Sequence, residues 1–480
     1  MAGSVGFVFI SLLLLPITLT SAAQLQVLSL ASIQGEATCV IVNQTCADPA
    51  GVPGTLCWGY GTRGALGQGS SSNVGTSASK AVNLLPGAMM LGWDGPKPVA
   101  VKFASYHTRS FGCSVLENGK VKCTGWKYRG CHLDNIDNTQ LFVGTSSADM
   151  PPDDLPLPDG YNNITDIMTA VPNAVLAQNG TDETSRRLLL WAQGFDGSMA
   201  KGQSGTVVVK TPSAITPISF RSRNYQLLNV VVIGADTVCV RLENLTDTSD
   251  KDVMCWGDKA FSIQGPLTQV NLGEAAGDVP GNLQALQFPT GCEPTMLEGG
   301  KEHACVICSH NNQIYCWGSN QNRQLGIGST AFKVGYYPTE WGDNLTAVDL
   351  GTGRSAKDVK CAKKFCCAIT DEDKVKCWGT NTDGQLGTGD TTLRGDATPM
   401  NLTYVDLGGD SLVKQIVTGD QHVCVLTKTT NEVKCWGKNA NGALGINSTD
   451  TIGDDPGEMG SNLKAVYFGE DGHCTPPSPP

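Results

Sequence analysis

The chain has 480 residues, of which 16% are charged and 40% are hydrophobic, and it contains 57 glycines. This length suits two or three average domains or one large closed β architecture, and the composition excludes collagen, a long coiled coil and a wholly disordered chain. The formal net charge of −11 opposes binding to phosphate backbones and anionic lipid surfaces, so we expect no nucleic-acid partner.

The N-terminus has the pattern of a secretory signal peptide. Residues 5–15 are almost wholly apolar, Pro16 ends that run, and residues 21–23 supply the small side chains of a cleavage site. A buried N-terminal strand is the alternative interpretation. We predict a signal peptide over residues 1–23 and a mature chain that begins near Gln24. No later stretch approaches the roughly 18 apolar residues that span a bilayer, so we expect no membrane insertion.

The cysteine content also indicates the secretory pathway. Nineteen cysteines are too many for a reducing compartment unless they bind metal, and no tight zinc-binding spacing is present, so disulfides are the better interpretation. Seven Asn-x-Ser/Thr sequons predict N-glycosylation of a secreted protein. They are Asn43, Asn163, Asn179, Asn244, Asn344, Asn401 and Asn447.

A repeated anchor organises the mature chain. Five copies read Cys-Trp-Gly, beginning at Cys57, Cys255, Cys316, Cys377 and Cys435, and two degenerate copies lie at Cys123 and Leu190. The seven anchor positions are spaced 66, 67, 65, 61, 61 and 58 residues apart. A regular spacing of this length is typical of a repeat array.

Each anchor except the third has a second cysteine upstream, in a separate apolar segment, with turn-forming residues between the two. This pattern predicts a β-hairpin, and facing residues of antiparallel strands are close enough for a disulfide. The third copy has Ala174 and Leu190 at these two positions, so both cysteines are lost together, which independent buried thiols would not explain. The predicted disulfides are Cys39–Cys57, Cys113–Cys123, Cys239–Cys255, Cys305–Cys316, Cys367–Cys377 and Cys424–Cys435.

Two further signals follow the anchors. A Gly-x-Leu-Gly type of turn lies at residues 64–67, 323–326, 384–387 and 442–445; phosphate binding is an alternative there, but the Lys-Ser/Thr that it requires is missing. Another strand signal lies at residues 345–351, 402–408 and 463–469, and the last of these has no counterpart before the first unit. We predict that residues 463–469 join the first unit and close a ring, which removes exposed sheet edges.

Residues 419–445, with their Gly-Asp-Gln-His-Val-Cys and Lys-Cys-Trp-Gly strings, resemble the repeat of the regulator of chromosome condensation family. The resemblance covers the mature chain and is most specific in copies five to seven. It implies an all-β, seven-bladed β-propeller with four-stranded blades, closed by a C-terminal strand that joins the N-terminal blade. The propeller is expected over residues 24–470, followed by a Pro-rich tail at residues 471–480.

Family functions transfer poorly from this resemblance. The nuclear member is a nucleotide-exchange factor that docks on chromatin, which does not fit a signal peptide and sequons. Other members are protein-binding propellers, and plant receptor kinases of the crinkly type carry a related extracellular propeller. A receptor-type role for this chain would need a separate membrane partner.

The sequence shows no persuasive catalytic constellation. His303 and His422 occupy one repeat position and are expected to pack, and the acidic pairs and runs in loops are expected to be solvated turn residues. The alternative is an extracellular hydrolase with two carboxylates on the central face of the propeller, acting on glycans. Unpaired carboxylates with shifted pKa values at the axis would favour the hydrolase, whereas a polar ring would favour binding.

Our principal prediction is therefore a secreted, non-catalytic binding or scaffold propeller for an extracellular protein or cell-surface glycan, with no cofactor and no metal. Trp93, Trp126 and Tyr128 depart from the repeat and are the candidate binding residues. Seven cysteines stay unassigned, so at least one thiol is free or bonded to another chain, and Cys474 beside the Pro-rich tail is the candidate. The seven are Cys46, Cys131, Cys292, Cys308, Cys361, Cys366 and Cys474.

Overall fold

The structure is a computed structural model. It describes residues 27–30, 35–42, 54–61, 66, 70–77, 98–106, 109–126, 142–143, 154–155, 157–158, 161–168, 173–179, 186–194, 199, 201, 207–209, 215, 217–218, 220, 224–234, 237–260, 263–266, 272, 283–396, 402–409, 412–466 and 468. These residues contain β-strands, turns and three short 3-10 helices, and none of them lies in an α-helix. No helix in this part of the chain is long and apolar enough to span a membrane.

The strands form seven antiparallel sheets that follow one another along the chain. The first three sheets are β1(Val27–Leu30), β2(Ala37–Val42) and β3(Gly54–Gly59); β4(Pro98–Tyr106), β5(Arg109–Leu116), β6(Val121–Trp126) and β7(Phe142–Val143); and β8(Tyr161–Met168), β9(Asn173–Asn179), β10(Arg187–Gly194) and β11(Val207–Val209). The fourth and fifth are β12(Tyr225–Ile233), β13(Thr237–Asn244) and β14(Lys251–Gly257); and β15(Pro294–Gly299), β16(His303–Cys308), β17(Ile314–Ser319) and β18(Lys333–Val334). The sixth and seventh are β19(Ala356–Cys361), β20(Phe365–Thr370) and β21(Val375–Gly379); and β22(Val413–Thr418), β23(His422–Thr427) and β24(Val433–Gly437). The 3-10 helices are η10(Pro338–Glu340), η11(Gly342–Asn344) and η12(Gly460–Asn462).

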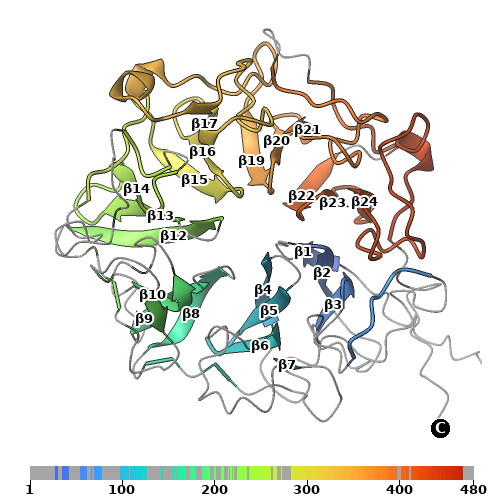
Figure 1. Cartoon of the computed structure of the whole chain (residues 1–480), viewed down its shortest axis with the longest axis horizontal. Helices are drawn as coiled ribbons and strands as arrows, with labels where there is room; N and C mark the ends of the chain where they lie inside the picture. The colour runs from blue at the N-terminus through green and yellow to red at the C-terminus, as the bar shows by residue number, and fades with distance from the viewer. Residues whose placement is uncertain are drawn as a thin grey trace, which may run out of the picture.

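The sheets are arranged around a common centre, with the first strand of each sheet innermost (Figure 1). Contacts between sheets follow this order, because β12 meets β15, β15 meets β19, β19 meets β22, and β22 meets β1. The first and the seventh sheets are therefore neighbours, although they lie at opposite ends of the sequence. This is the radial arrangement of a β-propeller.

The outer edge of the sheets varies. The second, third and fifth sheets have four strands, and the other four have three among the described residues. In the three-stranded sheets a single β-bridge takes the place of the fourth strand, between the anchor glycine and a later residue. These bridges are Gly59–Val74, Gly257–Leu272, Gly379–Arg394 and Gly437–Ile452.

The predicted exchange of a strand between the two ends of the chain is wrong for the described residues. Ala465 forms its β-bridge with Lys434 of β24, and the Val466 N–H donates to Val433 O at 2.7 Å. The equivalent segments behave alike, because Ala347 bridges to Tyr315 and Tyr404 bridges to Lys376, each beside the third strand of its own sheet. The repeated segment therefore completes the unit that precedes it.

Side chains join the two ends instead. Phe468 packs edge-on against Trp58, with ring centroids 5.9 Å apart, and Val466 belongs to one buried cluster with residues of β1, β3 and β23. The Leu30 N–H donates to Oε1 of Gln415, and Nε2 of Gln415 donates back to Leu30 O. The seam between the seventh and first sheets is thus a packed and hydrogen-bonded contact.

Candidate binding surface

The twelve predicted disulfide cysteines lie in register across the hairpins. Each predicted pair is bonded, with Cα atoms 4.0–4.1 Å apart. In the third sheet Leu190 faces Ala174 at the same register. Two further bonds, Cys292–Cys308 and Cys361–Cys366, take up four of the unassigned cysteines. Cys46, Cys131 and Cys474 lie outside the described residues.

The anchor tryptophans of the first, sixth and seventh sheets each tie their sheet to the Gly-rich turn of the unit before it in the ring. The indole N–H of Trp378 donates to Gln324 O at 3.0 Å, and that of Trp436 donates to Gln385 O at 3.0 Å. At the seam, Trp58 donates to Ala443 O at 2.9 Å. These indoles are fully buried, so the turn satisfies a donor that would otherwise be costly to bury.

An asparagine three residues after the tryptophan holds each of these turns, a role that the sequence analysis missed. Oδ1 of Asn381 accepts from the Leu386 N–H at 2.9 Å, while Nδ2 donates to Asp390 O at 2.6 Å. Asn320 and Asn439 make the corresponding bonds to Leu325 and Leu444. The recurrence of Trp-Gly-x-Asn in three copies was the available signal.

His303 and His422 pack between sheets, as expected from their repeat position. Nε2 of His422 lies 3.0 Å from Oγ1 of Thr38, whose hydroxyl also donates to Ala443 O at 2.9 Å. A hydroxyl has one proton to donate, so His422 Nε2–H donates to Thr38. Burial lowers the pKa of His422 to about 4 and that of His303 to about 3, so both rings are neutral at pH 7.

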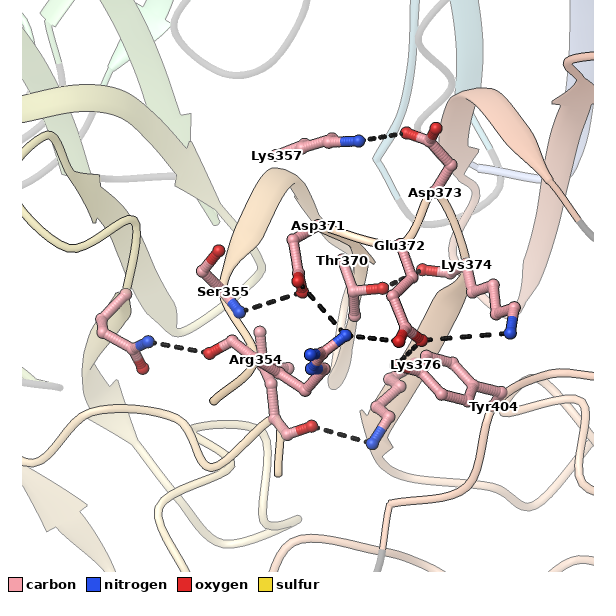
Figure 2. Close-up of polar contacts among 12 residues, drawn as sticks. Arg354, Ser355, Lys357, Thr370, Asp371, Glu372, Asp373, Lys374, Lys376 and Tyr404 are labelled. Carbon is pink, nitrogen blue, oxygen red and sulfur yellow. Dashed lines mark hydrogen bonds and ion pairs between the residues drawn. The ribbon is translucent and has the colours of Figure 1, made fainter. Parts of the chain in front are cut away.

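The acidic run at residues 371–373, one of the candidate carboxylate groups, is paired with cations (Figure 2). Arg354 binds Asp371 at 3.2 Å and also binds Glu372, whose Oε2 accepts from the Tyr404 hydroxyl at 2.8 Å. Lys357 and Lys428 bind Asp373 at 2.5 and 2.6 Å, and their hydrogen bonds lower its pKa. Because Lys428 belongs to the seventh sheet's hairpin, Asp373 links two sheets and stays ionised, which does not suit a general acid.

The inner strands offer a second group of carboxylates, a pair formed by Glu298 of β15 and Asp358 of β19. Both bind Lys360, which lies 3.3 Å from Asp358 and also contacts Glu298. Burial raises the pKa of Asp358 against the opposing effect of Lys360. A lysine shared between two acids is a structural ion-pair network across neighbouring sheets.

An aromatic patch stands out on the outer edge of the fifth sheet. Phe332 is 66% exposed and Tyr337 is 57% exposed, the highest values among the large hydrophobic side chains of the described residues. The rings of Tyr336 and Tyr337 meet edge to face at 4.8 Å, and Lys333 Nζ lies 4.0 Å from the Tyr336 ring centroid. We call Phe332, Lys333, Tyr336 and Tyr337 the aromatic patch.

The patch departs from the repeat. When the sequences of the units are aligned on Gly335, Gly395 and Gly453, Phe332 and Tyr337 correspond to Thr392 and residue 397 in the sixth unit and to Asp450 and Asp455 in the seventh. Sequence reasoning missed the patch, whose only signal is that these two aromatic positions differ from the aligned positions of other units. Exposed Tyr and Phe with low conformational freedom are typical anchors of protein interfaces.

The binding residues proposed from sequence are placed only in part. Trp126 ends β6, where its backbone pairs with Phe142, whereas Trp93 and Tyr128 lie outside the described residues. Among the sequons, Asn344 is exposed in η11, and Asn244 uses its amide to bind Asp250 at 2.9 Å. Asn447 has a positive φ of 60°, Asn163 and Asn179 lie in β8 and β9, and Asn43 and Asn401 lie outside the described residues.

The sheet order and the interlocking contacts define the class of the protein: a β-propeller of seven sheets. Solved structures support the fold. The yeast protein RCC1 (Prp20), solved bound to Kap60, matches with a TM-score of 0.59 and 14% identity, over 92% of this chain and 85% of that chain. Human WBSCR16 matches with a TM-score of 0.52 and 15% identity, over 74% of this chain and 79% of that chain.

Models of one repeat family match part of the chain. The regulator of chromosome condensation (RCC1) repeat is matched at residues 311–369 and 372–426, and a second model of the repeat at residues 356–385 and 413–443. The chain is thus a relative of the RCC1 repeat family, and the resemblance seen in its sequence is confirmed.

Curated relatives match over part of their length. The X-linked retinitis pigmentosa GTPase regulator of Canis lupus familiaris is 30% identical over 159 residues, which are 33% of this chain and 14% of that protein. The ultraviolet-B receptor UVR8 of Arabidopsis thaliana is 26% identical over 199 residues, 41% of this chain and 39% of that protein. The chain therefore spans much less than two thirds of these relatives.

Proposed function

We propose that this protein is a secreted, non-catalytic binding propeller, and that its aromatic patch contacts an extracellular protein. The observation that carries the proposal is the exposure of Phe332 and Tyr337 at positions where the sixth and seventh units have small or acidic residues. Burying these rings against a partner would recover apolar surface that the propeller itself leaves in water.

The rest of the chain supports a scaffold role. Disulfides within hairpins, indole bonds between sheets and ion pairs across sheets all restrict relative motion, so the patch is held on a rigid support. Relatives bear names such as GTPase regulator and receptor, and the yeast propeller was solved bound to Kap60, which supports a protein-binding role for this fold here too.

The extracellular setting rests on the sequence. The signal peptide over residues 1–23, the sequons and the cysteine-rich hairpins together favour the secretory pathway. Trp93, Trp126 and Tyr128 remain proposed additional contacts, Cys474 remains a proposed intermolecular thiol, and a receptor-type role would place the protein partner in a membrane.

Two groups of described carboxylates do not suit the hydrolase alternative, because their members are paired with cations. Glu298 and Asp358 share Lys360, and Asp373 is held ionised by two lysines. A retaining or inverting glycosidase needs one carboxyl that keeps its proton and a second one across an open cleft. Paired carboxylates do not supply this arrangement.

The test is partner capture with a matched pair of variants. The double variant Phe332→Ser/Tyr337→Ser removes the patch, while Leu393→Ser changes another exposed apolar residue, 38% exposed, at the same edge of the sixth unit. A protein that crosslinks from extracellular extract to wild type and to the control, but about tenfold less to the double variant, supports the proposal. Equal recovery with all three proteins overturns it, and binding on a glycan array that depends on the patch would replace the protein partner with a glycan.

A further inference from the structure

The Cys361–Cys366 disulfide falls outside the repeat. It joins facing residues of β19 and β20. The corresponding facing pairs are Gly299 with Ala304 in the fifth sheet and Thr418 with Val423 in the seventh. It encloses a separation of 5 residues, against 10 to 18 for the hairpin bonds. In the chain-entropy account, a shorter loop stabilises the fold less, so stability explains this bond poorly.

A buried imidazole faces this disulfide from the neighbouring sheet. Nε2 of His303 lies 3.0 Å from Sγ of Cys366, and Nδ1 of His303 has no hydrogen-bond partner among the described residues. His303 is fully buried. At the same position of the seventh sheet, His422 binds the hydroxyl of Thr38, a much better partner than a disulfide sulfur.

The backbone makes room for this ring. A Cβ on Gly300 would lie 2.1 Å from Cε1 of His303, so only glycine allows the imidazole to occupy this position. Cys361 is 8% exposed, whereas Cys366 and His303 are fully buried. The donor atoms of the three side chains all lie within 4.8 Å of one another.

We propose that Cys361, Cys366 and His303 form a zinc site when the disulfide is reduced, so that disulfide and metal exclude each other. An external dithiol supplies two electrons and two protons to the S–S bond and leaves as its own cyclic disulfide. Zn²⁺ then displaces the two thiol protons and binds both thiolates and Nε2 of His303. The inference does not depend on the proposed binding function.

The donor set suits this cation. Two thiolates and one imidazole are common zinc ligands, and they leave a fourth position open. Two thiolates neutralise the charge of Zn²⁺. An uncompensated charge would be costly to bury in a site that excludes water. Nε2 of His303 would exchange a weak contact with sulfur for a metal bond. A further sulfur, that of Cys305, lies 3.6 Å from Cys361 Sγ and is itself bonded to Cys316.

The experiment opens the bond in the folded, full-length protein with limiting phosphine, which adds no competing thiol. Differential alkylation and mass mapping identify the disulfide that opens first. Cd²⁺ is then added as a spectroscopic probe for thiolate ligation, and Zn²⁺ competes with it. We expect Cys361–Cys366 to open before the hairpin bonds, and one Cd²⁺ to bind per chain with a thiolate charge-transfer band that Zn²⁺ removes.

Matched variants separate the site from other thiols. His303→Ala should weaken Cd²⁺ binding by about tenfold or more, because it removes a ligand, whereas His422→Ala should leave the affinity unchanged. The double variant Cys361→Ser/Cys366→Ser should lose the band and keep the fold. The proposal is overturned if the hairpin bonds open first, if the opened protein binds no Cd²⁺, or if His303→Ala and His422→Ala bind it equally.

Discussion

At the scale of single residues, the glycines that end the Gly-rich turns of the last three units, Gly326, Gly387 and Gly445, pack against a tryptophan of the neighbouring sheet. Gly387 has φ +66°, and a Cβ there would lie 2.8 Å from Nε1 of Trp436 and 2.9 Å from Cγ1 of Val405. We expect Gly387→Ala to lower the free energy of unfolding by about 3 kcal/mol, from backbone strain and from overpacking. Gly353→Ala is the control, because Gly353 also has positive φ, at +71°, but open space around it, and it should lose only about 1 kcal/mol. Urea unfolding measures both, and equal losses would contradict the packing argument.

A second residue-scale prediction concerns pH. Full burial lowers the pKa of His422 to about 4 from its ordinary 6.5. The unfolded chain therefore takes up this proton more readily, so the stability due to the neutral ring is complete above pH 6.5 and is lost progressively as the pH falls towards 4. The loss from this ring approaches about 3 kcal/mol. His422→Gln should flatten the fall in urea stability between pH 7 and pH 4.5, and parallel curves for the variant and wild type would contradict it.

At the scale of the hairpin, the third sheet lacks the bond that the other six share. Leu190 faces Ala174 in the register that the cysteines occupy elsewhere. The double variant Ala174→Cys/Leu190→Cys should therefore form a bond across a separation of 16 residues, as Cys239–Cys255 does, and raise stability by up to about 3 kcal/mol. Mass mapping under non-reducing conditions and urea unfolding check the bond and the gain. Ala174→Cys alone is the control, and two free thiols in the double variant would refute the register.

Local sequence patterns predicted the hairpins, the anchors and the turns. They missed the contacts that side chains make with neighbouring sheets. The hairpins, the anchor and the turn lie within about twenty residues of one another, so periodicity and spacing expose them. The partner of His422 is Thr38, 384 positions away, and no local pattern relates the two. Cys292 and Cys361 could not be paired from sequence because neither repeats. The aromatic patch is visible in the sequence only as a difference in residue type between the fifth unit and the units aligned with it.

At the scale of the whole molecule, the closure of the ring is the point where local pattern was misleading. The segment at residues 463–469 has the same sequence signal as residues 345–351. Such a signal indicates a strand but does not indicate which sheet the strand joins. The bridge between Ala465 and Lys434 assigns it to the seventh sheet. The seam therefore depends on side chains, among them Lys438 and Glu36 at 3.2 Å and the ring pair of Phe468 and Trp58.

This assignment predicts which strand loses protection when the backbone hydrogen bond of Val466 is removed. Val466→Pro removes the N–H that donates to Val433 O at 2.7 Å, so amide hydrogen exchange should accelerate in β24. Val466→Ala is the control, because it keeps that N–H and loses only the side chain that packs in the cluster shared with the first sheet. Exchange that both variants accelerate equally is due to this lost packing, and the excess in the proline variant is due to the backbone bond. An excess confined to β24 supports closure by side chains, whereas an excess in β1 or β3 would mean that the C-terminal segment pairs with the first sheet.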